Sequence, residues 1–251
     1  MTAEHKAEIE KIRARSSERA FEIIRVIMPR KVIELTQMLV TPELNVPLAQ
    51  VRQLVGHDAG STAEATASSS MDTSDTIDGP AKKKRKAPGG SATAVVEENG
   101  VNSAEINSNA AVMTAMRILK ANILEFIEHL TSVKIWIQLN IPRIEDGNNF
   151  GVTIQEETLS ELSRAEEAAF STLEAAPKYF LLRAKYLTKM LKYPGVADYR
   201  NAVYELDEKE YVNQCMTIKE LRNNYSILHD MISKNWDKIR KPRSESGMSL
   251  Y

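Results

Sequence analysis

The sequence is short of cysteine, of aromatic residues and of any excess of one charge, and each shortage excludes a class of protein. The 251 residues include one cysteine, Cys215, which excludes an internal disulfide framework and fits a reducing compartment. Aromatic residues make up only 6%, with 10 glycines and 9 prolines, a composition that favours an all-α protein over a β sandwich. The 33 Lys and Arg residues balance 34 Asp and Glu residues. The chain therefore lacks the basic excess that would indicate a nucleic-acid partner.

Long apolar runs are also missing. No apolar stretch approaches the roughly 20 residues that a membrane span requires, and residues 1–6 do not resemble a signal peptide. We therefore expect a soluble, intracellular protein without a membrane partner. The length allows one large domain or two small ones.

Patterns that carry catalysis or metal binding are absent as well. The four histidines are scattered and form neither His-x-x-x-His nor Glu-x-x-His, and Gly89-Gly90-Ser91 lacks the lysine of a phosphate-binding loop. Cys215 lies in a helical pattern without a local partner, and we expect it to be a small core residue. We expect His129 and His229 to be packed or solvated helix residues and not ligands. We expect no metal, no cofactor and no enzymatic activity, and a function in binding and conformational control.

Apolar residues recur at helical spacing in four segments: 4–40, 107–139, 154–192 and 198–240. Helices of about 35–40 residues are about 50–60 Å long at 1.5 Å per residue, and short turns between the last three make neighbours antiparallel. The pattern predicts an all-α fold, a long up-down-up-down four-helix bundle.

Local signals refine these helices. Pro29 should kink the first helix or split it at Met28, Pro177 predicts a bend in the third, and Asp198 can cap the start of the last. The second helix is apolar nearly all round between Val133 and Leu139, which indicates burial against another subunit as well as against its own core.

The segment 56–107 differs from the rest because Ala, Ser and Thr dominate and large apolar residues are almost missing. We predict that it is disordered, which divides the chain into an N-terminal helix and turn (1–55), an insert (56–107) and a C-terminal part (108–251). Between two prolines the insert carries five consecutive basic residues: Lys82, Lys83, Lys84, Arg85 and Lys86. This cluster is typical of a peptide read by a nuclear import receptor and favours nuclear localisation; a solvated charge run or a weak nucleic-acid patch is the alternative.

The connection between the second and third helices, 141–152, contains more chemistry than a turn requires. Pro142 ends the preceding helix, while Gly147 and Gly151 supply free backbone. Residues 153–156 read as a capping box that opens the next helix, and Phe150 is an aromatic residue able to pin the loop. A well-made turn and a functional loop both remain open on this pattern alone.

The same stretch, 141–158, closely resembles the activation loop of the 11S (REG) proteasome activators. Further resemblance lies at 192–194, 198–200, 205–211, 220–223, 228–232 and 241–243. The match is dense from about Ala110 to Tyr251 and loose over the first helix. The basic cluster, the Asp-Glu-Lys-Glu-Tyr sequence and the terminal Leu250-Tyr251 look most like the gamma, nuclear type.

The resemblance implies a homoheptameric ring that caps the 20S proteasome α-ring and admits peptides without ATP or ubiquitin recognition. It implies an anchor in the C-terminal tail 242–251, formed by Met248, Ser249, Leu250 and Tyr251. It places Lys185 on the lining of a central channel. The implied gate-opening loop consists of Arg143, Ile144, Glu145, Asp146, Gly147, Asn148, Asn149, Phe150 and Gly151, with Asn148 foremost.

A rival interpretation is a nuclear coiled-coil scaffold without any protease-activating role. Such a scaffold would form elongated dimers and would have no use for a free C-terminus.

Overall fold

The computed structural model describes residues 3–52, 106–143, 147 and 149–243, and every regular element in these ranges is a helix. The elements are α1 (Ala3–Glu22), the π-helix η1 (Ile23–Ile27), α2 (Met28–Met38), the 3₁₀-helix η2 (Pro42–Leu44), α3 (Leu48–Val51), α4 (Ala110–Leu139), α5 (Phe150–Lys192), α6 (Ala197–Lys234) and α7 (Trp236–Arg240). The chain divides into two compact units, Met1–Gln53 with Ser108–Tyr251, and Leu54–Asn107. All of these helices belong to the first unit. The predicted disorder of the insert and its basic cluster, Lys82 to Lys86, fall outside the described residues.

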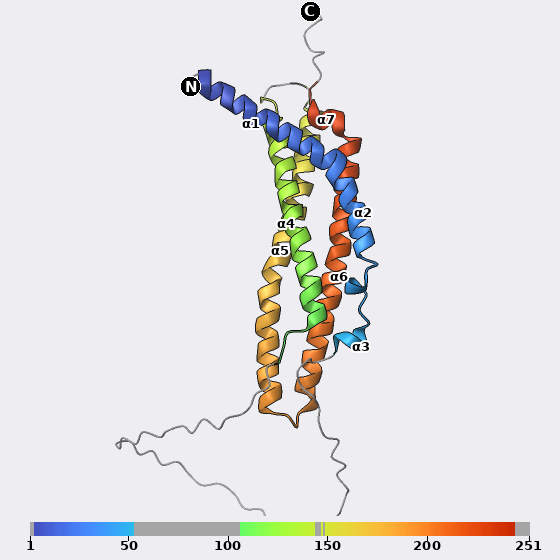
Figure 1. The fold of residues 1–251 in the computed structure, drawn as a ribbon. Coiled ribbons are helices and arrows are strands. Elements are labelled where there is room, and N and C mark those ends of the chain that lie inside the picture. Colours follow the sequence, from blue (N-terminus) through green and yellow to red (C-terminus); the bar gives the residue numbers. More distant parts are fainter. Residues whose placement is uncertain (1–2, 53–105, 144–146, 148, 244–251) are drawn as a thin grey trace, which may run out of the picture. The chain divides into compact units, whose positions relative to one another are not determined.

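The three long helices α4, α5 and α6 lie side by side, and the chain reverses direction at each connection (Figure 1). Helix α2 runs along α6 in the opposite direction, while α1 turns away from α2 and crosses towards α4. The described helices therefore form an all-helical bundle. None of them is both long enough and apolar enough to cross a membrane.

The first predicted helix consists of three consecutive helical elements. The backbone stays helical from α1 through the π-helical turn η1 into α2, so of the two predicted outcomes for Pro29 the kink is found and not the split. Proline has no amide hydrogen and its ring clashes with the carbonyl one turn earlier, so the wider π turn accommodates Pro29. The helix changes direction at this turn, so α1 and α2 point differently (Figure 1).

The later helices depart from the predicted boundaries in two places. Helix α5 begins at Phe150, four residues earlier than predicted, and stays helical through Pro177. The last predicted helix is interrupted at Asn235, whose side chain donates to the Met231 carbonyl at 2.9 Å and separates α6 from α7. The predicted cap by Asp198 is wrong: Val196 occupies the N-cap, and Asp198 lies in the first turn, where a negative charge favours the helix dipole.

An aromatic cluster fixes α7 against the rest of the bundle. The rings of Trp136 and Trp236 stack at 5.5 Å between centroids, and Phe21 makes edge contacts with both, at 5.3 and 5.0 Å. The Arg25 guanidinium lies 4.8 Å from the Trp236 ring centroid. Each aromatic pair contributes about 0.5–1.5 kcal/mol beyond its buried area, so α1, α4 and α7 are held together near the end of α4.

Some of the predicted apolar faces stay exposed in the part of the chain that the structure describes. On the first helix Ala20, Ile23 and Ile27 are buried, whereas Ile9 is 44% and Ile12 is 57% exposed. Ile135, on the nearly all-apolar end of α4, is 45% exposed, although Val133 and Trp136 are buried.

Candidate functional site

The predicted loop joins α4 to α5 at the end of the bundle where α7 also lies (Figure 1). Helix α4 ends at Leu139 with Asn140 as its C-cap, and Pro142 follows in irregular backbone. Gly147 has a φ of +124°, a conformation that side chains rarely allow, so the predicted free backbone at Gly147 is confirmed. The loop residues Ile144, Glu145, Asp146 and Asn148 lie outside the described residues.

Gly151 has a different role from the one predicted. It is buried in the first turn of α5, where a Cβ atom would lie 2.1 Å from the Pro242 carbonyl oxygen and 2.6 Å from the Pro242 Cα. Glycine is needed here because two backbones approach each other closely, not because the loop must turn. The C-terminal segment therefore packs directly against the start of α5.

The predicted capping box at residues 153–156 is wrong. Asn149 is the N-cap of α5 and its side chain caps no backbone amide; the Thr153 hydroxyl donates to the Asn149 carbonyl at 3.4 Å. The helix starts one turn earlier than expected, so Thr153 is already inside it. Phe150, expected to pin the loop, is 63% exposed at the helix start.

Gln155 joins three segments of the chain. Its side chain is fully buried, and its Nε2 donates to the Ile239 carbonyl at 2.8 Å and to the Asn140 carbonyl at 3.3 Å. These carbonyls belong to the C-terminal α7 and to the end of α4. Its Oε1 is buried and accepts no hydrogen bond among the described residues.

A further contact joins the loop to the C-terminal segment. Nη2 of Arg243 donates to Oδ1 of Asn149 at 2.8 Å. A cavity of about 590 Å³ lies beside these contacts, lined by Asn140 at the end of α4, by Pro142 of the loop, by α7 and by Lys241 to Arg243. We call the described residues of 140–155 and 239–243 the loop end.

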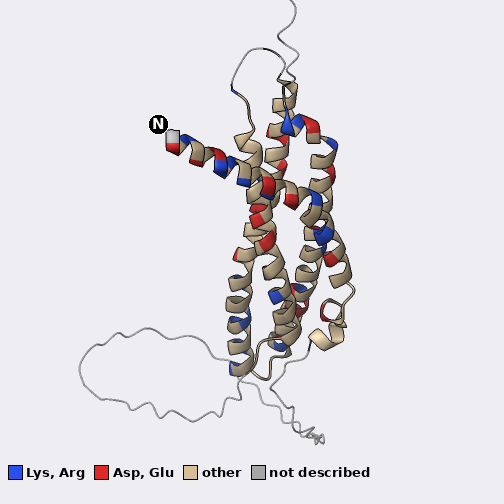
Figure 2. Ribbon diagram, turned by 45° about the horizontal axis from the view of Figure 1, so that its top comes forward, with Lys and Arg blue, Asp and Glu red and all other residues tan. Residues whose placement is uncertain are grey.

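Of the remaining predicted site residues, the structure describes Lys185 but not the C-terminal anchor. Met248, Ser249, Leu250 and Tyr251 lie outside the described residues, which stop at Arg243. Lys185 is exposed on α5. Acidic residues of α5 gather in its N-terminal half and basic residues in its C-terminal half, which contains Lys185 (Figure 2). Its position on a channel wall stays a prediction.

Sequence reasoning missed a buried ionic group on the first unit. Asp207 on α6 accepts from Arg183 Nε at 2.9 Å, from the Tyr179 hydroxyl at 2.8 Å and from Asn109 Nδ2 at 3.1 Å. Asn109 also donates to the Val51 carbonyl at 2.6 Å, and its Oδ1 accepts from a backbone amide in the first turn of α4. Burial, followed by the charge of Asp207, raises the pKa of Tyr179, which therefore stays a neutral donor.

This second group joins the two stretches of chain that flank the insert, because Val51 precedes the insert and Asn109 follows it. We call Val51, Asn109, Tyr179, Arg183 and Asp207 the insert end. The signal available in the sequence was the spacing of Tyr179 and Arg183, one helical turn apart. Their partner on another helix carries no local signal.

His129 and Cys215 have the packed positions that were expected of them. His129 is buried, with Nδ1 2.8 Å from the Tyr225 hydroxyl, and its burial lowers its pKa. Cys215 is half-buried with Sγ 3.6 Å from the Leu44 carbonyl, and burial raises the pKa of this thiol. A raised pKa keeps the thiol protonated and unreactive. Among the described residues no three His, Cys, Asp or Glu side chains could hold a metal ion together.

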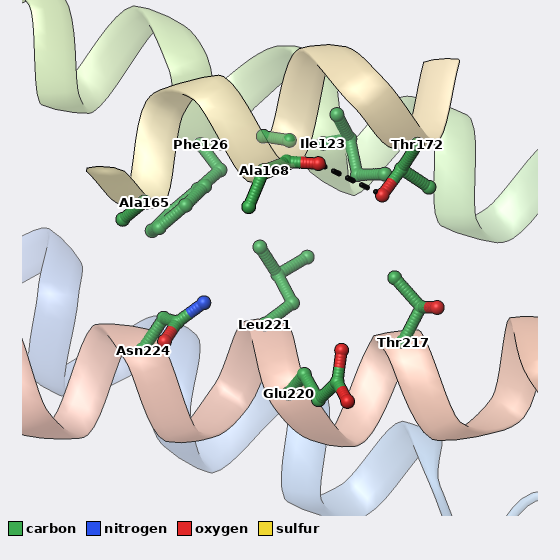
Figure 3. A pocket seen from close by; sticks show the side chains of 10 residues that line it. Ile123, Phe126, Ala165, Ala168, Thr172, Thr217, Glu220, Leu221 and Asn224 are labelled. Atoms are coloured by element: carbon green, nitrogen blue, oxygen red, sulfur yellow. Dashed lines mark hydrogen bonds between the residues drawn. The ribbon is translucent and has the colours of Figure 1, made fainter. Parts of the chain in front are cut away.

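The cavities between α4, α5 and α6 carry no catalytic arrangement in the described residues. One of about 40 Å³ separates Ala165 and Ala168 of α5 from Leu221 of α6 (Figure 3). It is far smaller than the roughly 300–1,000 Å³ of a ligand pocket. A neighbouring cavity of about 390 Å³ lies beside Pro177 and Phe180 and is mainly apolar.

Comparison with known proteins agrees with the resemblance found in the sequence. Residues 105–249 match the family model "Proteasome activator PA28, C-terminal". The chain is 40% identical to proteasome activator complex subunit 3 of Gallus gallus over 254 residues, which cover 99% of this chain and 96% of the relative. The subunit 3 of Homo sapiens is 40% identical over 255 residues, with the same coverage.

Solved structures show the same fold. The 11S subunit of the Plasmodium falciparum proteasome, PA28, matches with a TM-score of 0.69 at 33% identity and 96% coverage of both chains. The activator PA26, in a complex with an archaebacterial 20S proteasome, matches 58% of this chain and 73% of its own with a TM-score of 0.54. At 14% identity this second likeness shows the fold alone. From the family match and the extended identity to subunit 3, the chain belongs to the PA28 family of proteasome activators.

Proposed function

We propose that this chain activates the 20S proteasome as a homoheptameric ring, independently of ATP and ubiquitin. The C-terminal tails of the ring dock on the proteasome α-ring, and the loops 141–152 open its gate to peptides. The observation that carries the proposal is the loop end, where the start of the tail contacts the α5 side of the loop and Gln155 joins α7 to the α4 side. An activator of this kind needs its anchor and its effector on the same face.

The physical requirements of gate opening fit this arrangement. A single short tail binds weakly, but seven tails on a rigid ring act together because linked sites raise the effective concentration. Binding alone shifts no equilibrium, so the loop must contact the open gate more favourably than the closed gate. The long helices α4 and α5 support the loop on both sides and limit its displacement.

The proposed ring is built from four-helix protomers, with the α1–α2 segment as the fourth helix beside α4, α5 and α6. Apolar side chains that one chain leaves exposed, such as Ile9, Ile12 and Ile135, support contacts between protomers. Lys185 lines the channel in this arrangement. The protein acts as a regulator of a peptidase and not as an enzyme.

We also propose that the protein is nuclear. The support is the basic cluster Lys82 to Lys86 between prolines, which suits an import receptor. Replacing these five residues with alanine should move a fluorescently tagged protein from the nucleus to the cytoplasm of a transfected cell.

The function is tested by hydrolysis of fluorogenic peptides by purified 20S proteasome, with co-sedimentation to report binding. Wild-type protein should stimulate hydrolysis, and deletion of Leu250 and Tyr251 should abolish binding. Asn148→Tyr should keep the ring and its binding but remove stimulation. Normal stimulation by the Asn148 variant would exclude the loop as the effector.

Native mass spectrometry separates the ring from the rival scaffold. A mass of seven chains supports the activator, whereas a dimer without effect on peptide hydrolysis supports the scaffold.

A further inference from the structure

The tail and the loop are not separate attachments, because one buried side chain joins them. Gln155 donates from a single nitrogen to Ile239 in α7 and to Asn140 at the end of α4. Ile239 lies just before the tail, and Asn140 lies just before the loop. A displacement of either segment changes the hydrogen bond to the other.

Two further contacts connect the tail to the second end of the loop. The close approach of Gly151 to Pro242 leaves no space between the start of α5 and the C-terminal segment. Arg243 binds the side chain of Asn149, which precedes α5. The C-terminal segment therefore contacts both ends of the loop, on its α4 side through Gln155 and on its α5 side directly.

The buried side chain of Gln155 has one satisfied and one unsatisfied polar atom among the described residues. A buried polar atom without a partner carries a desolvation cost, and Gln155 Oε1 is such an atom among the described residues. A leucine of similar volume would avoid this cost. Nε2, however, donates to two carbonyls, one in α7 and one at the end of α4. These two segments do not belong to the same helix.

We propose that Gln155 is a positioning residue that couples the seating of the C-terminal tail to the conformation of the loop. This coupling rests on the proposed function, since it explains how docking of the tail and opening of the gate occur together. Tail docking fixes the segment 239–243, and the bridge through Gln155 then narrows the range of loop positions. An activator without the bridge still docks, but a smaller fraction of its loops is in the position that opens the gate.

The variant Gln155→Leu removes the donor and keeps the volume. The chain offers a matched control in Gln214→Leu, because Gln214 is also buried within the bundle and its Oε1 also lacks a partner among the described residues. Gln214 lies on α6 and donates to Glu210, one turn earlier on the same helix, and not to the loop end. A general effect of replacing a buried glutamine would therefore be the same in both variants.

In the peptide-hydrolysis assay, Gln155→Leu should lower stimulation at saturating activator by about two- to tenfold, the range expected for loss of the one neutral hydrogen bond that Gln155 makes on the loop side, to Asn140. The activator concentration at half-maximal stimulation should change less than the stimulation at saturation, because the docking residues of the tail are intact. Gln214→Leu should match wild type in both quantities. A rise in the half-maximal concentration without a change at saturation would overturn the proposal.

Hydrogen–deuterium exchange tests the coupling in the free protein, so its result does not depend on the proteasome. The peptide covering 141–150 should exchange faster in Gln155→Leu than in wild type or Gln214→Leu. If Gln155→Leu does not fold, Arg243→Ala provides a second variant, which removes the exposed hydrogen bond to Asn149. The same increase in the exchange rate of the loop peptide is expected. Unchanged loop exchange in the variants overturns the coupling, whereas faster exchange with no stimulation by wild type overturns only the proposed function.

Discussion

The loop end and the insert end perform the same task with opposite chemistry. Each joins segments that are far apart in the sequence, and Figure 1 places them towards opposite ends of the long helices. The insert end uses a buried ion pair whose carboxylate has three partners. At the loop end the Gln155 amide and the Arg243 guanidinium donate to neutral oxygens, Gly151 contacts Pro242, and one oxygen is unsatisfied within the described chain.

The difference has an energetic consequence. Buried charges cost several kcal/mol to desolvate, so the Arg183–Asp207 pair is tolerated only when every partner is in place. Neutral hydrogen bonds contribute about 1 kcal/mol each and can break and reform at little cost. The insert end therefore keeps the bundle closed where the chain departs into the insert, whereas the loop end positions a segment without locking it.

The largest effect is expected at the insert end. Asp207→Ala leaves the buried Arg183 guanidinium without its carboxylate and should lower the free energy of unfolding by about 3–5 kcal/mol. Urea denaturation at a fixed protomer concentration measures this, because assembly makes stability depend on concentration.

The matched control replaces the whole pair. The double variant Arg183→Met with Asp207→Leu removes both charges and should recover most of the lost stability. If the double variant is as unstable as Asp207→Ala, the contribution of the insert end does not come from the ion pair.

At the loop end the expected effect is functional more than thermodynamic. Gly151→Ala places a Cβ 2.1 Å from the Pro242 carbonyl oxygen, so the C-terminal segment must move. The strain is about 1–3 kcal/mol, and displacement of a segment near the chain terminus relieves part of it. Stimulation of the proteasome should fall severalfold while the unfolding midpoint changes little.

Gly195 provides the control for this substitution. It lies in the turn between α5 and α6, and a Cβ there would meet nothing within 4 Å. Gly195→Ala should leave both stimulation and stability at the wild-type level. Equal losses in the two alanine variants would show that contact with Pro242 is not the cause.

The two ends also differ in how far the sequence predicts them. Pro142 and Gly147 indicate the loop locally, because proline and glycine act on their own backbone. The role of Gly151 could not be predicted, since its reason is Pro242, a residue that only the folded chain brings close. The Arg183–Asp207 pair was missed for the same cause: a cross-helix partner leaves no mark on helical periodicity.

The helices themselves followed the apolar spacing closely, and the departures occur where side chains act beyond their own segment. At Asn235, where the last helix is interrupted, the side chain donates to the backbone one turn earlier. Gln155 does not take part in the predicted capping box and instead donates to carbonyls of two other segments. Family membership, by contrast, rests on the order of residues in the loop and could be recognised without any of these contacts.

His129 is a third buried polar site, to be compared with the two ends. It lies inside the bundle and has a neutral hydrogen-bond partner, the Tyr225 hydroxyl. Its ring contacts the Tyr225 hydroxyl, and Arg19, Lys31, Glu125 and Glu128 are the charged groups that act on it. Burial lowers its pKa in the folded state, so below the unfolded value of about 6.5 the unfolded chain binds the extra proton more readily. The stability from the neutral ring is therefore complete above this pH and is lost as the pH falls towards the folded pKa.

The substitution His129→Gln removes this titration and keeps a hydrogen-bonding side chain. The difference in unfolding free energy between wild type and variant, measured by urea denaturation, should therefore shrink between about pH 7.5 and pH 5.5. This should be the smallest of the three effects, because no buried charge is left unpaired above that range. A difference that stays constant across the range would show that His129 is not the group that titrates.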